Sequence, residues 1–282
     1  MCMKYFLFFI LFTALFFSCK KWEKGAIPSY IHINNVKIIT DANTQGAATH
    51  KISDVWINID GNRQGTYEMP VTFPVLATGQ HQVMVRAGIK VNGIAASRAI
   101  YPFFNTITYD TLLPEGGKIV LSPTFSYLPE TIFAWIEGFQ NNGFTLDRMS
   151  ECDTTLYVEA DSTGNKYGKF TIDVIRQRFY YKSTEAYPLP ANGSAVFLEM
   201  DYRCDHPFTV GLLINKLQST VTNNVIIINP YPNTFNHIYI DFSNIAVQNY
   251  DALTFNVFFQ SVLQSGYTQG NVEIDNIKLI HF

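Results

Sequence analysis

Short runs rich in β-branched and aromatic residues recur along most of the chain. Residues 30–37 (YIHINNVK) alternate between apolar and polar as a half-buried strand does, and further runs lie at 55–59 (VWINI), 195–202 (AVFLEMDY) and 253–259 (LTFNVFF). Gly, Asn, Asp and Pro bound these runs, and no convincing long amphipathic helix separates them. The pattern predicts an all-β protein made of packed sandwiches.

The first predicted domain covers residues 28–124. Asp60-Gly61 and Asn92-Gly93 are dipeptides that tolerate positive φ, so each predicts a hairpin turn. The run 71–73 lies between two prolines, which cannot donate to a strand ladder, so we place it at a sheet edge. This many strands in about 90 residues is typical of an immunoglobulin-like sandwich.

The stretch 59–88 reads IDGNRQGTYEMP…VLATGQHQVMVRAG. It resembles PEGA-type and related surface β-sandwich modules, in which an Asp-Gly hairpin precedes a strand with a Gly-x-His start. The resemblance implies a fold and no activity.

The second predicted domain covers residues 125–282. Its segments FLEMDY (197–202) and FTVGLL (208–213), and its ending VEIDNIKL (272–279), resemble galactose-binding-like jelly rolls, including carbohydrate-binding modules. The resemblance implies a jelly-roll β-sandwich, in which two sheets bury the alternating residues of many short strands.

The N-terminus has the features of an export signal. Residues 1–18 carry one early lysine and then an apolar run of about 13 residues, which suits a signal peptide and is too short for a membrane helix. The run ends at Ser18-Cys19, which resembles a bacterial lipoprotein signal and implies covalent lipid on Cys19. The alternative is a plain signal peptide with an incidental cysteine.

The residues after Cys19 bear on where the protein is displayed. Residues 20–24 (KKWEK) partly resemble the signal that sends Bacteroidota-type lipoproteins to the outer face of the outer membrane. We therefore expect residues 19–27 to form a lipidated tether and the protein to be anchored in the outer membrane at the extracellular face. The periplasmic leaflet is the alternative.

Composition narrows the class of partner. The 282 residues carry a formal charge of −3, from 20 Lys+Arg against 23 Asp+Glu, which argues against nucleic acid because its binders usually present a basic face. Apolar residues make up 47% and charged residues 15%, which excludes a disordered chain. Cys152 and Cys204 remain after export, and we expect them to form one disulfide in an oxidising compartment, with two buried free thiols as the competing interpretation.

The sequence offers no strong catalytic or metal motif. Glu199 and Asp201 share one strand face at the i, i+2 spacing, but such a pair alone is usually a solvated face, and we predict that the protein is not an enzyme. The jelly-roll resemblance implies a structural calcium, for which Glu137 and Asp275 offer suitable oxygen ligands. No other cofactor is expected.

Two binding surfaces are hypotheses from the sequence. For a glycan, we select aromatic and basic residues near loop-forming positions, with rim packing as the alternative: Tyr180, Tyr181, Tyr231 and Arg178. Tyr231 is expected on a rigid loop, 229–233, because two prolines flank it. For a protein partner, we select residues of apolar, proline-bearing segments, with sandwich core as the alternative: Tyr67, Phe73, Tyr101 and Phe103.

Three functions follow from these surfaces. The leading prediction is an accessory or structural subunit that binds an outer-membrane β-barrel or another envelope protein. The second is a surface lipoprotein that binds a glycan through its C-terminal jelly roll. A carbohydrate-active enzyme is the third.

Overall fold

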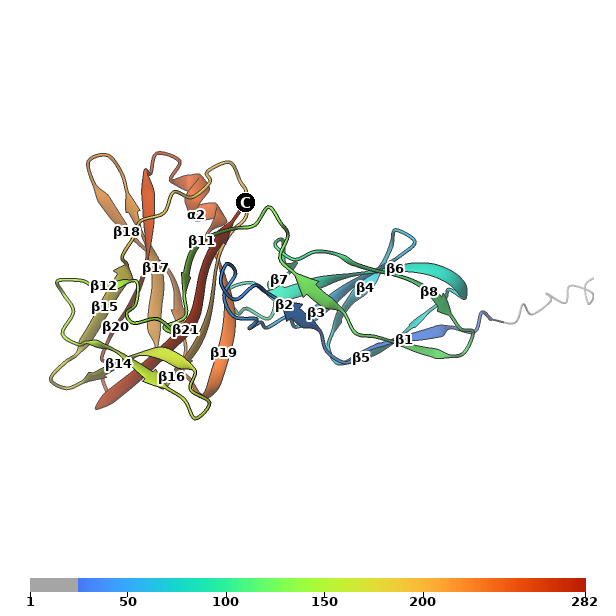
Figure 1. Cartoon of the computed structure of the whole chain (residues 1–282), viewed down its shortest axis with the longest axis horizontal. Helices are drawn as coiled ribbons and strands as arrows, with labels where there is room; N and C mark the ends of the chain where they lie inside the picture. Colours follow the sequence, from blue (N-terminus) through green and yellow to red (C-terminus); the bar gives the residue numbers. More distant parts are fainter. Residues whose placement is uncertain (1–24) are drawn as a thin grey trace, which may run out of the picture.

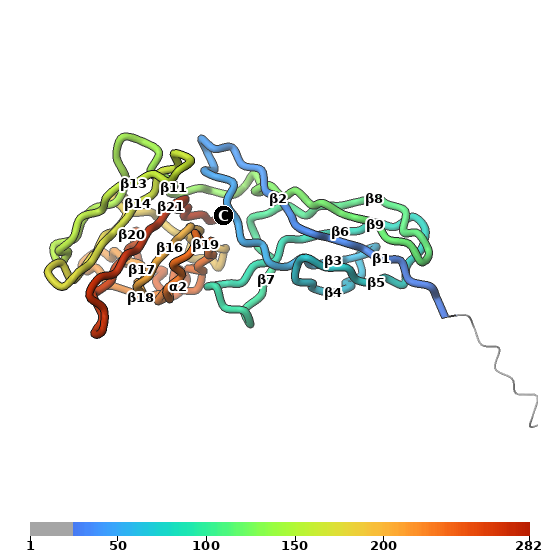
Figure 2. Tube along the Cα trace, turned by 90° about the horizontal axis from the view of Figure 1, so that it is seen from below, coloured from blue at the N-terminus to red at the C-terminus, as the bar shows by residue number. Residues whose placement is uncertain are grey.

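The computed structural model of the protein describes residues 25–282, which are almost entirely β-structure (Figure 1). An N-terminal part, β1–β10, and a C-terminal part, β11–β21, lie end to end along the long axis in both views (Figures 1 and 2). The described residues contain no helix that is long and apolar enough to cross a membrane. The predicted all-β fold is confirmed.

The N-terminal part consists of three sheets. Their orders are β4-β3-β6-β7 with β8 also on β6, β5-β1-β9, and β10-β2. The strands are β1 (Ser29–Ile33), β2 (Lys37–Ile39), β3 (Asp54–Ile59), β4 (Asn62–Glu68), β5 (Val71–Val75), β6 (Gly79–Lys90), β7 (Arg98–Ile100), β8 (Ile107–Leu113), β9 (Lys118–Leu121) and β10 (Thr124–Ser126).

The two hairpin turns and the edge strand predicted for this part are present in the structure. Asp60 and Gly61 have φ of 50° and 79° in the β3–β4 hairpin, and Asn92 and Gly93 have φ of 55° and 68° between β6 and β7. The proline-bracketed β5 pairs only with β1 and is an edge strand. The immunoglobulin-like classification of this part stays a prediction.

The described residues form two separate hydrophobic cores. The first is built from β1, β3, β5 and β6, and it also contains Phe125, at which the second domain was predicted to begin. The second core lies between the two sheets of the C-terminal part. Three buried side chains of the C-terminal part belong to the first core, because the N-terminal part packs on their sheet: Phe197, Tyr239 and Ile280.

The C-terminal part is a jelly-roll β-sandwich. One sheet has the order β13-β14-β21-β16-β19 with β11 also on β21, and the other has the order β12-β15-β20-β17-β18. The elements are β11 (Ile132–Glu137), β12 (Leu146–Arg148), β13 (Leu156–Ala160), β14 (Lys166–Asp173), β15 (Arg178–Ser183), β16 (Val196–Cys204), β17 (Phe208–Asn215), β18 (Thr220–Ile228), β19 (Tyr231–Asp241), α2 (Ser243–Gln248), β20 (Thr254–Val262) and β21 (Gln269–His281).

Strand β16 lacks the alternation of a half-exposed strand. Eight of its nine residues are buried. Leu198 and Met200 face the second core, whereas Phe197 packs in the first core and Glu199 contacts Tyr101 of the N-terminal part. Both faces of this strand are therefore covered, one by the opposite sheet and one by the N-terminal part.

Candidate functional site

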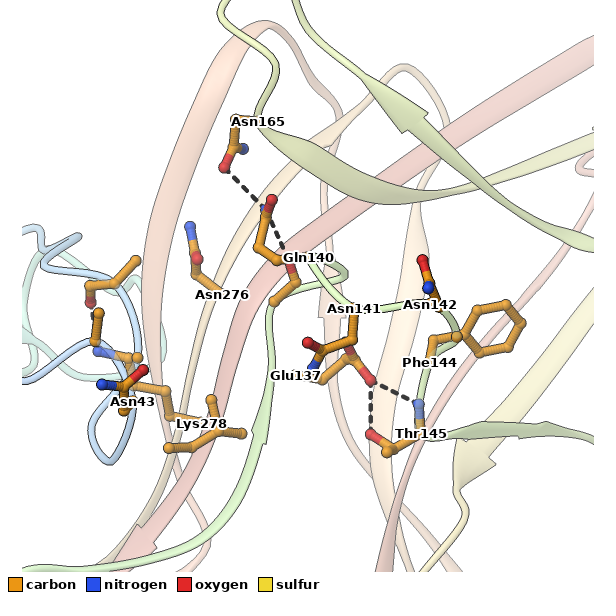
Figure 3. Close-up of a pocket in the computed structure, with 16 residues that line it drawn as sticks. Asn43, Glu137, Gln140, Asn141, Asn142, Phe144, Thr145, Asn165, Asn276 and Lys278 are labelled. Atoms are coloured by element: carbon orange, nitrogen blue, oxygen red, sulfur yellow. Dashed lines mark hydrogen bonds between the residues drawn. The ribbon is translucent and has the colours of Figure 1, made fainter.

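A polar pocket of about 860 Å³ lies where the two parts meet (Figure 3). One wall is the turn at 42–47 from the N-terminal part, and the remainder comes from β11, the loop after it, Asn165 just before β14, and β21. Six carboxamide side chains line the pocket: Asn43, Gln140, Asn141, Asn142, Asn165 and Asn276.

A single carboxylate shapes the loop that follows β11. Glu137 accepts hydrogen bonds from the Phe139 amide at 2.7 Å, the Thr145 amide at 2.6 Å and the Thr145 hydroxyl at 2.7 Å, two of which Figure 3 shows. Positive φ at Phe139 (55°) and Gly143 (138°) lets the chain reverse within a few residues. Glu137 thus ties both ends of the loop 138–145 together.

The carboxamides fall into two classes by their hydrogen bonds. Gln140 donates to the Asn165 side chain at 3.1 Å and to two backbone carbonyls, and Asn165 donates to Asp275 at 2.9 Å. Asn141 and Asn142 are exposed, and their side chains have no hydrogen-bond partner within residues 25–282. The first class holds the pocket in shape, and the second class leaves donors and acceptors free for a ligand.

The charged groups that line the pocket are already paired. Lys278 is fully buried, and its Nζ donates to the Ala47 carbonyl at 2.7 Å and to the Tyr127 hydroxyl at 3.2 Å. Burial lowers the pKa of Lys278, and the carboxylates of Glu199 and Asp201 oppose this shift. Because Glu137 is also saturated with donors, the pocket offers a ligand mainly neutral groups.

We expect the Asp275 carboxyl, beside the pocket, to titrate near pH 6 in the folded protein. Burial raises its pKa from the usual 3.8 to about 6, hydrogen bonds from Asn165 and Asn276 oppose the rise, and the charges of Asp201 and Glu137 add to it. The folded state therefore gains stability from this group below about pH 3.8 and loses it as the pH rises through about 6.

Carbon-13 NMR of the Asp275 side chain measures this titration directly. Glu137→Gln removes one repelling charge and should lower the midpoint, whereas Glu115→Gln, at an exposed turn of the N-terminal part, should leave it unchanged. A midpoint that does not move in Glu137→Gln would contradict the contribution of the Glu137 charge to the pKa of Asp275.

No family model and no curated protein matches this chain. Similar solved structures include a xylan-binding domain of carbohydrate-binding module family 22, at 13% identity over 52% of this chain and 93% of that one, with a TM-score of 0.36. Another is the family 11 module of Clostridium thermocellum in complex with a β-1,3-1,4-mixed-linked tetrasaccharide, at 11% identity over 51% and 93%, with a TM-score of 0.37.

None of the four predicted glycan-binding residues lines the pocket. Tyr181 is buried in the second core, where its hydroxyl accepts a hydrogen bond from the Leu156 amide, so its prediction as a ligand contact is wrong. Tyr180 is half-buried against Phe258, and Arg178 is exposed at the start of β15. Tyr231 begins β19 rather than a loop, because Cys204 pairs with it, and its ring lies 5.5 Å from the Lys51 ammonium.

The predicted docking residues are mostly core. Phe73, Tyr101 and Phe103 are 3%, 1% and 0% exposed, so they cannot contact another protein in the folded state and the docking prediction is wrong for them. Tyr67 is half-buried and stacks on Phe73 with a ring separation of 4.0 Å. A β-barrel or other envelope partner stays a prediction, now without Phe73, Tyr101 and Phe103 as its contacts.

The predicted disulfide is absent. Cys152 and Cys204 are both free and buried. The Cys152 thiol donates to the Thr154 carbonyl at 3.2 Å, and the Cys204 thiol donates to the Asn229 carbonyl at 3.5 Å. Each thiol thus has a separate local partner, and the competing interpretation of two buried thiols is the correct one.

The calcium expectation rests on carboxylates that already have partners. Both oxygens of Glu137 accept hydrogen bonds, and Asp275 accepts them from the Asn276 amide at 2.7 Å and from Asn165. In the described part of the chain, no group of three or more His, Cys, Asp or Glu side chains is arranged to hold a metal ion. Calcium binding by Glu137 and Asp275 therefore stays a prediction.

Glu199 and Asp201 lie together, but not where a substrate can reach. Glu199 is fully buried and accepts hydrogen bonds from the hydroxyls of Tyr101 and Tyr127. Asp201 pairs with the His237 ring at 2.7 Å. The pair is therefore part of the contact between the two parts of the molecule.

The sequence did not predict the pocket. Its predictions for the N-terminal signal and the lipidated cysteine concern residues that the structure does not describe. Cys19 and the signal at 1–18 lie outside the described residues. The missed loop 138–145 does carry a signal, since the run QNNGF (140–144) concentrates three carboxamides and a glycine directly after a strand. Asn43 and Asn276 carry no such signal, because only the fold brings them to this loop.

Proposed function

We propose that this protein binds a carbohydrate without catalysing its conversion, while anchored in the outer membrane through lipid on Cys19. The observation that carries the proposal is the pocket lined by six carboxamides, with Asn141 and Asn142 unpartnered in the described structure. A carboxamide both donates and accepts hydrogen bonds, as does a sugar hydroxyl, so a cluster of them suits a polyhydroxylated neutral ligand. Glycan binding is thus favoured over the role of complex subunit.

The charge distribution favours binding over hydrolysis. A glycosidase of the common kind needs two carboxyl groups that flank the scissile bond. Glu137 is the single carboxylate in the pocket lining, and its hydrogen bonds to the loop backbone occupy both oxygens. The pocket therefore supplies recognition groups without an acid and base pair.

We expect Asn142→Ala to weaken glycan binding by the chain at 25–282 about tenfold, because two hydrogen bonds of the side chain are lost at roughly 0.5–1.5 kcal/mol each. The measurement is a glycan array, followed by calorimetry on each glycan that binds. Asn35→Ala is the matched control, since Asn35 is an exposed carboxamide outside the pocket. If no glycan binds at millimolar concentration, the proposed function is wrong.

A further inference from the structure

The N-terminal part contributes a wall of the pocket. The turn that begins at Asp41 is closed by its own hydrogen bonds, since the Gln45 amide donates to the Asp41 carbonyl at 2.7 Å and the Asn43 amide donates to the Asp41 carboxylate at 2.9 Å. The Asn43 side chain is exposed and lines the pocket on the side opposite Asn142 (Figure 3). A ligand that fills the pocket therefore contacts both parts of the molecule.

The C-terminal part holds this turn in place. The Lys278 ammonium donates to the Ala47 carbonyl, while the Thr40 hydroxyl donates to the Gly46 carbonyl at 2.8 Å. A Cβ on Gly46 would lie 3.2 Å from the Lys278 side chain and 3.3 Å from Ile136, so the backbone of the turn sits directly on β11 and β21. The turn is thus a fixed wall.

Further contacts fix the two parts relative to each other. The Asn92 amide donates to the Tyr239 carbonyl at 2.8 Å, and the Asn92 side chain accepts from the Asp241 amide at 2.9 Å. The Lys51 amide donates to the Tyr239 hydroxyl at 3.1 Å. Because these contacts join residues of the chain itself, they hold both walls of the pocket in position, which reduces the ordering cost of binding.

The charges around the pocket select among saccharides. Glu137 lies in the lining, Asp275 and Asp201 lie beneath Asn276 and accept its hydrogen bonds, and the one lining ammonium, Lys278, is buried and paired. A uronic acid would meet carboxylates without an available cation, so it would be repelled. A cationic sugar would find the Glu137 carboxylate already occupied by backbone donors.

We propose that the pocket is a single site formed by both parts of the chain, which binds an uncharged oligosaccharide with Asn43 as a direct contact. The inference rests on the proposed function and adds the ligand class and the contribution of the N-terminal part.

The test uses the chain at 25–282 with cellohexaose, xylohexaose, mannohexaose and hexagalacturonate as probes in calorimetry. We expect at least one neutral hexamer to bind and hexagalacturonate not to bind at millimolar concentration. Asn43→Ala should weaken binding of the neutral hexamer about tenfold, the same loss expected for Asn142→Ala. Asn35→Ala should leave the affinity unchanged. All three positions are exposed, so folding is not at risk.

The outcomes separate the two proposals. Binding that Asn142→Ala weakens and Asn43→Ala does not, or equal binding of hexagalacturonate, would overturn the two-part site for uncharged sugars and leave carbohydrate binding intact. The absence of binding by every probe and by every glycan on an array would overturn both.

Discussion

Lys278→Met should lower the free energy of unfolding by about 3–5 kcal/mol, the range found when one partner of a buried ion pair is removed. Lys278 and Glu199 are both fully buried, with 3.9 Å between Nζ and Oε2. Methionine has a similar length, so the change removes a charge and two donated hydrogen bonds without opening a large cavity. Urea unfolding, monitored by the fluorescence of Trp135 and the other tryptophans, measures the loss.

Two variants distinguish the stability lost by breaking the buried ion pair from the stability lost by replacing any lysine. Lys118→Met removes an exposed lysine of β9 and should change stability by less than about 0.5 kcal/mol. Glu199→Gln combined with Lys278→Met should recover part of the loss, because no unpaired charge is then left in the interior. If the Lys278→Met variant is as stable as the Lys118→Met variant, the buried pair does not stabilise the fold and the prediction is wrong.

Gly211→Ala should destabilise the protein by about 3 kcal/mol, at the upper end of the cost of overpacking a core. A Cβ on Gly211 would lie 2.3 Å from the Phe258 ring and 2.4 Å from the Asn223 carbonyl oxygen. Phe258 is fully buried and Asn223 belongs to the paired strand β18, so neither can move without disturbing the sheet. Thermal unfolding followed by circular dichroism measures the change.

Gly25→Ala is the matched control for this substitution. Apart from its chain neighbours, no atom of the described residues lies within 4 Å of a Cβ at Gly25, so alanine should be tolerated there. If Gly211→Ala melts within about a degree of the parent protein, the close approach of Phe258 to the β17 backbone is not a constraint on the fold.

The contact between the two parts serves stability and the pocket at once. Lys278 joins them because it is paired with Glu199, bound to the Tyr127 hydroxyl and bound to the Ala47 carbonyl. The last of these bonds holds the turn that carries Asn43. A change in this buried contact should therefore affect ligand binding as well as unfolding.

Local chemistry explains which features could be predicted. The turn at Asp60-Gly61 and the edge position of β5 follow from positive φ and from missing proline donors, which are properties of the residues themselves. Tyr101 and Phe103 show the opposite case, since an apolar aromatic segment suits a core and a docking edge equally well. Only burial decides between them, and burial depends on what packs against the segment.

The sequence by itself determined an all-β chain with turns and edge strands at definite places, because side-chain periodicity and backbone preferences are local. Only the tertiary structure decided that both faces of β16 are covered, that Cys152 and Cys204 stay apart, and that carboxamides from both parts converge on one pocket. Asn43 and Asn276 lie far apart in the sequence, and their approach results from the packing of one part on the other. Such packing depends on many weak contacts at once, which no short motif records.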